Sequence, residues 1–156
     1  MTDEFLFYYG SAENKLNSKG QVAIPARFRS VVSDEDKSRN YVITRGEGNC
    51  LYMYTHRQFS KIKDNVRNFA AETEDIEFYR RFMAEAAAVE IDTQGRFVLP
   101  QGIMAEAGIK GPGILFIGMN DRIEIWEPAT YRASMESAGK KYEKQREEAA
   151  RAIFGI

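Results

Sequence analysis

The chain has 156 residues, of which 44% are hydrophobic and 12% aromatic, so it can bury a core without help from metals or disulfides. Its one cysteine, Cys50, excludes an intramolecular disulfide framework and a cysteine-rich zinc site. A net charge of −1 and a pI near 6.0 argue against indiscriminate binding to nucleic acid.

The N-terminus does not resemble a targeting or membrane segment. Residues 1–4 lack the basic start of a signal peptide. No apolar run approaches the roughly 18 residues that a membrane-spanning helix needs. We therefore expect a cytoplasmic protein that makes no membrane contact.

The first predicted elements surround a glycine turn. An apolar run at 5–9 predicts a strand covered on both sides, as a strand between layers or subunits is. Asn17 begins a turn in which its short side chain can bond the backbone two residues on, and Gly20 supplies a backbone angle that other residues resist. A short strand follows, and Pro25 suits the start of a helix that ends near residue 32.

A hairpin and two helices complete the first half. Strands at 41–45 and 50–54 are joined by a tight loop. Thr55 and Gln58 make a capping-box pattern at the start of the first helix, and Thr73 is the predicted cap of the second. Each helix carries an apolar stripe at helical spacing. The stripes are Phe59, Ile62, Val66 and Phe69 in the first helix, and Ile76, Phe82, Met83 and Ala86 in the second.

The same pattern returns 75 residues later. Residues 16–25 and 91–100 align with glycine on glycine, proline on proline and apolar on apolar residues. A short helix is again predicted, over 100–107, with Gly108 as its C-terminal cap. A second hairpin, over 113–126, matches the first after a three-residue change that falls in a loop, where length changes are tolerated. Self-similarity of this extent indicates an internal repeat.

The C-terminal segment predicts one long helix, from Pro128 to about residue 152. Glu136 with Lys140, and Glu147 with Arg151, have the spacing of favourable ion pairs. Large apolar residues are sparse, which is typical of a solvated helix. The alternative is that its narrow apolar stripe packs on a neighbouring subunit.

Residues for catalysis or metal binding do not form a recognisable constellation. His56, the one histidine, lies beside the predicted cap Thr55, where a surface role is the simpler interpretation. Cys50 is expected to be a buried structural thiol, because no histidine can be assigned to it. The acidic run at 72–77 is explained by the favourable electrostatics of a helix start. We expect no enzymatic activity, no cofactor and no metal.

The remaining chemistry lies between residues 14 and 32, which include four basic residues and no acidic one. These are Lys15, Lys19, Arg27 and Arg29. Lysine and arginine can hold phosphates, and arginine, asparagine and glutamine can contact base edges in a major groove. Arg27 and Arg29 point in different directions on a short helix, so either one can instead be solvated or bonded within the protein.

These segments resemble a known family. Residues 10–29 closely resemble the start of MraZ proteins, and 91–100 with the ending 122–126 resemble their second repeat. The family belongs to the AbrB-like (SpoVT–AbrB) DNA-binding group, and the resemblance covers about residues 5–150. It implies an α+β fold of two pseudo-symmetric, swapped-hairpin-type β-barrel halves with short helices.

The resemblance also implies a function and a division of the chain. The function is a transcriptional regulator of the division and cell-wall gene cluster, binding short repeats of double-stranded DNA upstream of its own operon as a ring-like homo-oligomer. Such a protein is cytoplasmic and nucleoid-associated. The expected units are a first repeat at 5–54, a helical linker at 55–88, a second repeat at 89–127 and a C-terminal helix at 128–156.

The family motif is Asp-x-x-Gly-Arg in each repeat. The second copy is intact from Asp92 to Arg96, whereas Asn17 and Gln21 replace the acid and the arginine in the first. Gln21 gives up a charge and a forked donor, and can instead read adenine. Arg96 can be tied to Asp92 within its own turn. The predicted DNA-binding residues are Lys15, Asn17, Ser18, Lys19, Gln21, Arg27, Arg29, Asp92, Gln94 and Arg96.

Two other functions are considered. An AbrB-type antitoxin would bind DNA and a toxin, but the fused pair of repeats counts against it. An oligomeric scaffold that has lost DNA binding is suggested by Gln21 and by the acidic pI.

Overall fold

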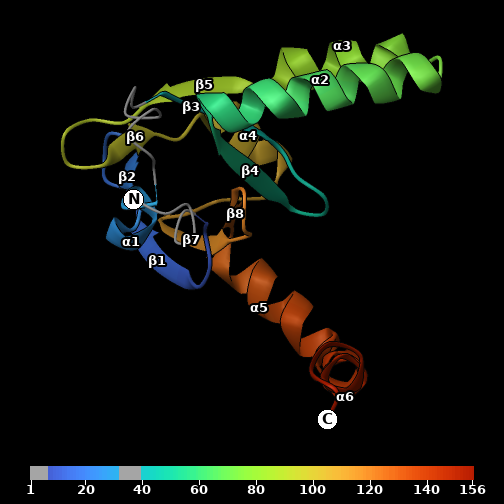
Figure 1. Ribbon diagram of the computed structural model, residues 1–156. Coiled ribbons are helices and arrows are strands. Elements are labelled where there is room, and N and C mark those ends of the chain that lie inside the picture. The colour runs from blue at the N-terminus through green and yellow to red at the C-terminus, as the bar shows by residue number, and fades with distance from the viewer. Residues whose placement is uncertain (1–6, 32–39) are drawn as a thin grey trace.

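A computed structural model describes residues 7–31 and 40–156 (Figure 1). This part of the chain is a mixed α+β fold with eight strands and six helices. The strands are β1 (Ser11–Lys15), β2 (Gln21–Ala23), β3 (Asn40–Arg45), β4 (Cys50–Thr55), β5 (Ala87–Glu90), β6 (Arg96–Val98), β7 (Gly113–Gly118) and β8 (Ile123–Trp126). The helices are α1 (Ala26–Arg29), α2 (His56–Glu72), α3 (Ile76–Glu85), α4 (Gln101–Glu106), α5 (Pro128–Ser137) and α6 (Gly139–Phe154).

The two repeats share one open antiparallel sheet. Its strand order is β1-β7-β8-β4-β3-β5, and β2 and β6 form a separate two-stranded ribbon. Each unit's first strand pairs with the third strand of the other unit, β1 with β7 and β5 with β3. Replacing each strand by its counterpart in the other repeat gives the same strand order read in reverse. This confirms the pseudo-symmetry of the two repeats. The predicted pair of β-barrel halves is not confirmed, because the sheet is open and the strands of the two units interleave in it.

Both short helices follow their strands as the sequence predicts. Pro25 and Pro100 occupy the N-cap positions of α1 and α4, one residue before the first helical position that was expected. Gly108 follows the end of α4 with a φ of +70°, so the predicted glycine cap is confirmed. The helix α1 ends at Arg29, with Ser30 as its C-cap, so the predicted end near residue 32 is too late.

The core lies between the sheet, the ribbon and the short helices. Val22 and Phe97, from the two strands of the ribbon, are each 1% exposed and belong to the same apolar cluster. Phe28 of α1 and Phe116 of β7 complete its centre. Because the ribbon is held to the body by its own central residues, its outer face has a fixed position.

The helices α2 and α3 form a hairpin along the β3 side of the sheet (Figure 1). Thr55 caps α2 as predicted, its Oγ1 accepting from the Gln58 N–H at 3.2 Å. The cap of α3 is Asp75, which accepts from the Phe78 N–H, and the prediction of Thr73 is wrong. The Thr73 hydroxyl instead donates to the Phe69 carbonyl, so it belongs to the end of α2.

The predicted apolar stripe of the second helix is only partly packed. Phe82 stacks on Phe59 of α2, with ring centroids 6.3 Å apart. Ile76 is 58% exposed, and none of residues 76–85 is fully buried. The reason is that α3 packs mainly on α2, so much of its apolar face reaches past the sheet.

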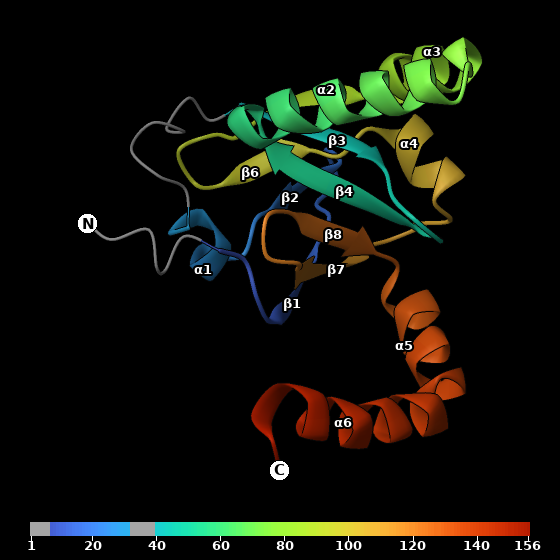
Figure 2. The ribbon, with the colours of Figure 1, turned by 45° about the vertical axis from the view of Figure 1, so that its right-hand side comes forward.

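The single long C-terminal helix that was predicted is wrong. The chain forms α5 and α6, with a break at Ala138 that is followed by the poor helix former Gly139. Glu136 and Lys140 therefore lie on different helices. Figure 2 shows α5 leading away from the sheet and α6 turning sharply from its end, and none of the residues of α6 is buried.

Residues 5 and 6 of the predicted N-terminal strand lie outside the described residues, and residues 7–9 form only an isolated bridge, so the prediction of a strand covered on both sides is wrong for them. Tyr8 is buried and bridges to Asn120, whereas Phe7 and Tyr9 are exposed. Among the described residues, no helix is both long enough and apolar enough to cross a membrane.

Candidate nucleic-acid interface

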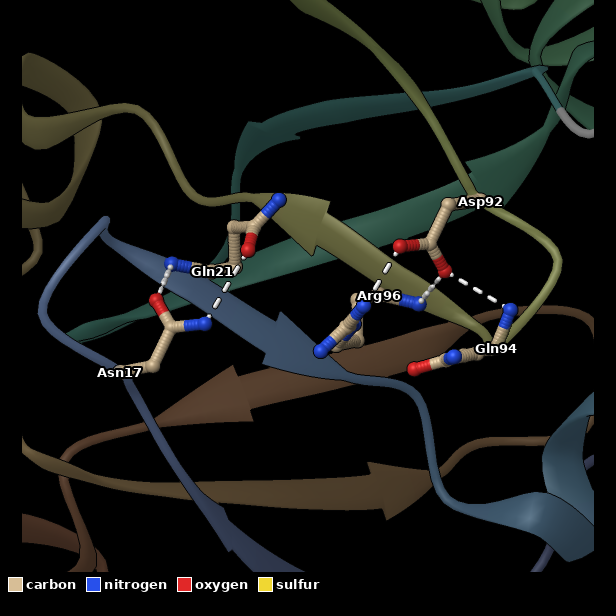
Figure 3. Close-up of polar contacts among 5 residues, drawn as sticks. All are labelled: Asn17, Gln21, Asp92, Gln94 and Arg96. Atoms are coloured by element: carbon tan, nitrogen blue, oxygen red, sulfur yellow. Dashed lines mark hydrogen bonds and ion pairs between the residues drawn. The ribbon is translucent and has the colours of Figure 1, made fainter.

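The two glycine turns have the same geometry (Figure 3). In the first, Asn17 Oδ1 accepts from the backbone N–H groups of Lys19 and Gln21, both at 2.9 Å. In the second, Asp92 Oδ1 accepts from the equivalent N–H groups of Gln94 and Arg96, at 2.8 and 2.9 Å. The predicted bracing of each turn by its first side chain is confirmed, and the brace extends to the residue after the glycine.

Glycine is required in both turns for the reason the sequence suggested. Gly20 has a φ of +75° and Gly95 a φ of +79°, a region that L side chains rarely adopt. The surroundings of the two residues differ. A Cβ on Gly20 would meet nothing within 4 Å, whereas a Cβ on Gly95 would lie 2.5 Å from Arg29 Nη1. Gly95 is therefore covered by a side chain from the other repeat.

The turns lie at opposite ends of the β2–β6 ribbon (Figure 3), because the strands are antiparallel and each begins directly after its turn. Each turn is bonded to the opposite strand, since the Ile24 N–H donates to the Gly95 carbonyl and the Leu99 N–H to the Gly20 carbonyl. With Val22 and Phe97 pointing into the core, strand alternation directs the neighbouring side chains outward. The outward residues are Gln21, Ala23, Arg96 and Val98.

The residue after each glycine is held by the first residue of its turn. Arg96 Nε donates to Asp92 Oδ2 at 3.2 Å, an ion pair that confirms the expected tie within the second turn. Asn17 Nδ2 donates to Gln21 Oε1 at 3.0 Å in the first turn. A neutral amide pair thus replaces an ion pair at an equivalent position.

Arg27 and Arg29 point in different directions, as expected. The Arg27 guanidinium donates to the Ser11 carbonyl and lies 5.4 Å from the centre of the Phe28 ring. Arg29 is exposed and crosses to the Gly95 turn of the second repeat. Arg27 thus has a structural role in the first repeat, and Arg29 adds positive charge to the second turn.

The other predicted site residues are divided between the two ends of the ribbon. Lys15, Ser18 and Lys19 are exposed around the first turn, and Gln94 is exposed in the second. The basic residues that are close together in the sequence therefore flank the ribbon on both sides. Sequence reasoning missed two outward residues, Ala23 and Val98, although the alternation of each strand is a readable signal.

Hydrogen bonds to the Asp92 carboxylate lower its pKa, first that from the Arg96 backbone N–H, then those from the Gln94 N–H and the Arg96 side chain. Because folding lowers this pKa, the ionised carboxylate stabilises the folded turn at pH values above the ordinary pKa of 3.8. This stabilisation is lost as the pH falls through the pKa of the folded state. We expect the amide resonances of Gln94 and Arg96 to shift with a midpoint below 3.8 in an NMR titration.

The first turn provides the internal control for this titration. Lys19 and Gln21 are bonded to the amide of Asn17, which does not titrate, so their resonances should stay in place at that midpoint. The variant Asp92→Asn should abolish the transition. A midpoint at or above 3.8 would contradict the bonding described for Asp92.

The described residues offer little for catalysis. Burial, aided by the negative charge of Glu124, raises the pKa of Cys50 to about 12, so the thiol is protonated at neutral pH. Its Sγ donates to the Glu47 carbonyl at 3.3 Å. His56 is exposed at the start of α2. Within residues 7–31 and 40–156, no three histidine, cysteine or acidic side chains gather as a metal site would require.

These features define a class of protein: an α+β chain of two repeats whose paired glycine turns flank a two-stranded ribbon. A family model described as "MraZ protein, putative antitoxin-like" matches residues 7–78 and again residues 82–153. The chain belongs to the MraZ family. The two matches begin 75 residues apart, which confirms the internal repeat.

Relatives cover most of the chain. It is 32% identical over 127 residues to the transcriptional regulator MraZ of Acetivibrio thermocellus, covering 81% of this chain and 85% of that protein. It is 34% identical over 127 residues to the one from Cytophaga hutchinsonii, covering 81% and 83%. With the one from Natranaerobius thermophilus it shares 30% identity over 142 residues, covering 90% and 95%.

Proposed function

We propose that this chain is a sequence-specific, DNA-binding transcriptional regulator that lays the outer face of the β2–β6 ribbon into a major groove. The observation that carries the proposal is the outward ribbon with a braced turn at each end and exposed cations beside both turns. The relatives named transcriptional regulators support it. The absence of a catalytic constellation from the described residues agrees with a binding role.

The dimensions of the ribbon suit a major groove. Three residues per strand span about 10 Å. A major groove is about 12 Å wide and admits a two-stranded ribbon. With the ribbon in the groove, its turns approach the phosphate strands on either side. Lys15 and Lys19 then face one strand, and Arg29 faces the other.

We also propose that the two repeats are related as swapped hairpins. The reciprocal pairing of β1 with β7 and of β5 with β3 supports a swapped-hairpin-type relation between the repeats. In this arrangement neither repeat completes its sheet alone. The ribbon, to which both repeats contribute one strand, is then the DNA-binding unit.

We further propose that the chain acts as a ring-like homo-oligomer. Its net charge of −1 gives a single copy little attraction for DNA, so several ribbons must act together. Phe7, Tyr9, Phe28 and Val31 line a mostly apolar hollow that the described residues of one copy leave open. The proposed targets are short repeats upstream of its own operon, in the division and cell-wall gene cluster, and the proposed location is the cytoplasm, in association with the nucleoid.

Affinity for the DNA directly upstream of its own gene tests this function. Lys15→Ala and Arg29→Ala should each weaken binding and reduce the salt slope by about 1 for each ribbon engaged, because each removes a phosphate contact. Two controls should bind almost as the unmodified protein does. Thr93→Ala changes an uncharged residue of the second turn, and Lys144→Ala removes the same charge from α6. Equal losses in all four variants would show that the ribbon is not the DNA-binding face.

The same titration separates the alternatives. A scaffold predicts no binding to upstream DNA even at low salt. An antitoxin-like role, which the description of the family model suggests, predicts binding to a protein partner in addition to DNA.

A further inference from the structure

One residue of the ribbon's outer face is unusual for its position. Val98 is 54% exposed, although Phe97 and Leu99 on either side of it are each 1% exposed. Single exposed apolar residues are common on protein surfaces, but Val98 lies on the face that is proposed to enter the groove. Its equivalent in the first repeat is Ala23, so the two halves of the ribbon differ here.

The strand register gives Val98 a specific neighbour. In the antiparallel ribbon, Val98 is directly opposite Gln21, and Arg96 is directly opposite Ala23. Directly opposite residues point to the same face with Cβ atoms about 5 Å apart. The outer face thus carries two pairs: an amide beside a branched apolar side chain, and a guanidinium beside a methyl group.

Resting on the proposed function, we propose that Gln21 and Val98 together read an A·T base pair in the major groove. A glutamine amide can bond both N6 and N7 of adenine, and an apolar side chain can contact the C5 methyl of thymine. These groups lie on the same edge of one base pair. The cross-strand pair therefore supplies both of the chemistries that distinguish A·T from G·C.

The Gln21 amide is oriented for this task. Its Oε1 already accepts from Asn17 Nδ2 at 3.0 Å, which restricts the rotation of the amide. A carbonyl oxygen has a second acceptor site, and the Nε2 group carries two donors. The amide can therefore accept from adenine N6 and donate to N7 while the bond to Asn17 is kept.

The other pair has the opposite preference. Arg96 bonds Asp92 through Nε, and its terminal nitrogens can form the fork that guanine O6 and N7 accept. Ala23 beside it is shorter than Val98 and reaches less far toward a base. The ribbon is therefore directional: it reads A·T at the end of the first turn and G·C at the end of the second.

Removing the thymine methyl tests the assignment. The probe is the DNA upstream of the chain's own gene, amplified once with thymidine and once with deoxyuridine at every thymine position. Losing one buried methyl contact should weaken binding of the unmodified protein about fourfold for each ribbon engaged. Val98→Ala should bind the two DNAs with nearly equal affinity, because it has already lost the partner of that methyl.

Two further variants complete the experiment. Val98→Thr keeps the shape and one methyl group, so it should retain part of the discrimination. Met135→Ala, which truncates a 47% exposed apolar residue on α5, should discriminate as strongly as the unmodified protein. Full discrimination by Val98→Ala, or none by the unmodified protein while it still binds, would overturn the A·T assignment alone. No binding of the unmodified protein to either DNA would instead contradict the proposed function, and the assignment with it.

Discussion

Raising the salt concentration from 50 to 200 mM should weaken DNA binding by about 10³- to 10⁵-fold. The reason is counterion release, with a log–log slope near −0.9 for each phosphate contacted. Lys15, Lys19 and Arg29 offer about three charged contacts per ribbon, because most N–H groups of the turns are already bonded within the turns. Two or three engaged ribbons give roughly six to nine such contacts, as a loss of this size requires. One ribbon with three contacts would lose only about 40-fold.

The spacing of the DNA repeats should matter as much as the salt. A rigid assembly engages two sites only at its own pitch, so two repeats in phase should bind far more tightly than one. Shifting one repeat by half a helical turn, about 5 base pairs, turns it to the other side of the duplex and should abolish the gain. Affinities are measured for one repeat, two in phase and two out of phase, at several salt concentrations.

The control for this series is the mass of the unbound protein by light scattering at micromolar concentration. An assembly should exceed the 17.8 kDa of one chain. Equal affinity for the three DNAs would contradict multivalent binding. A mass of one chain would contradict the proposed homo-oligomer.

Replacing Phe97 by alanine should destabilise the protein by about 3–5 kcal/mol. Phe97 is 1% exposed and pairs with Val22 at the centre of the ribbon, so its loss leaves a cavity between the ribbon and the body. Urea unfolding measures the cost as a lower midpoint at an unchanged slope. Thr93→Ala, an exposed change in the adjacent turn, should stay within about 0.5 kcal/mol. A cost below about 1 kcal/mol for Phe97→Ala would show that the ribbon is not anchored in the core.

The sequence was sufficient where structure is set locally. Asn17 and Asp92 brace their turns as their residue types predict, and both hairpins form around the expected loops. Thr55 caps α2 because the capping pattern depends on a few adjacent residues. Features of this kind need no knowledge of the rest of the chain.

Features that depend on distant contacts were not predictable in the same way. The sequences of β1 and β5 do not indicate that each pairs with a strand of the other repeat. Arg29 was grouped with its sequence neighbours, but the fold places it over Gly95. The break at Ala138 was missed although the poor helix former Gly139 follows it, because longer runs of helix-forming residues lie on both sides. The candidate site was therefore predicted as a set of residues, and its arrangement as two ends of a ribbon was not.

The pseudo-symmetric strand order of the two repeats has an evolutionary consequence. In a protein built from two copies of one short chain, every mutation appears twice, and the two halves of the binding surface cannot diverge. Here both halves are encoded separately in one gene. Gln21 and Arg96 therefore differ at equivalent positions, although the backbone bonding of the two turns is the same. If the ribbon binds DNA as proposed, one half of its surface can therefore change its base preference while the other half keeps its own.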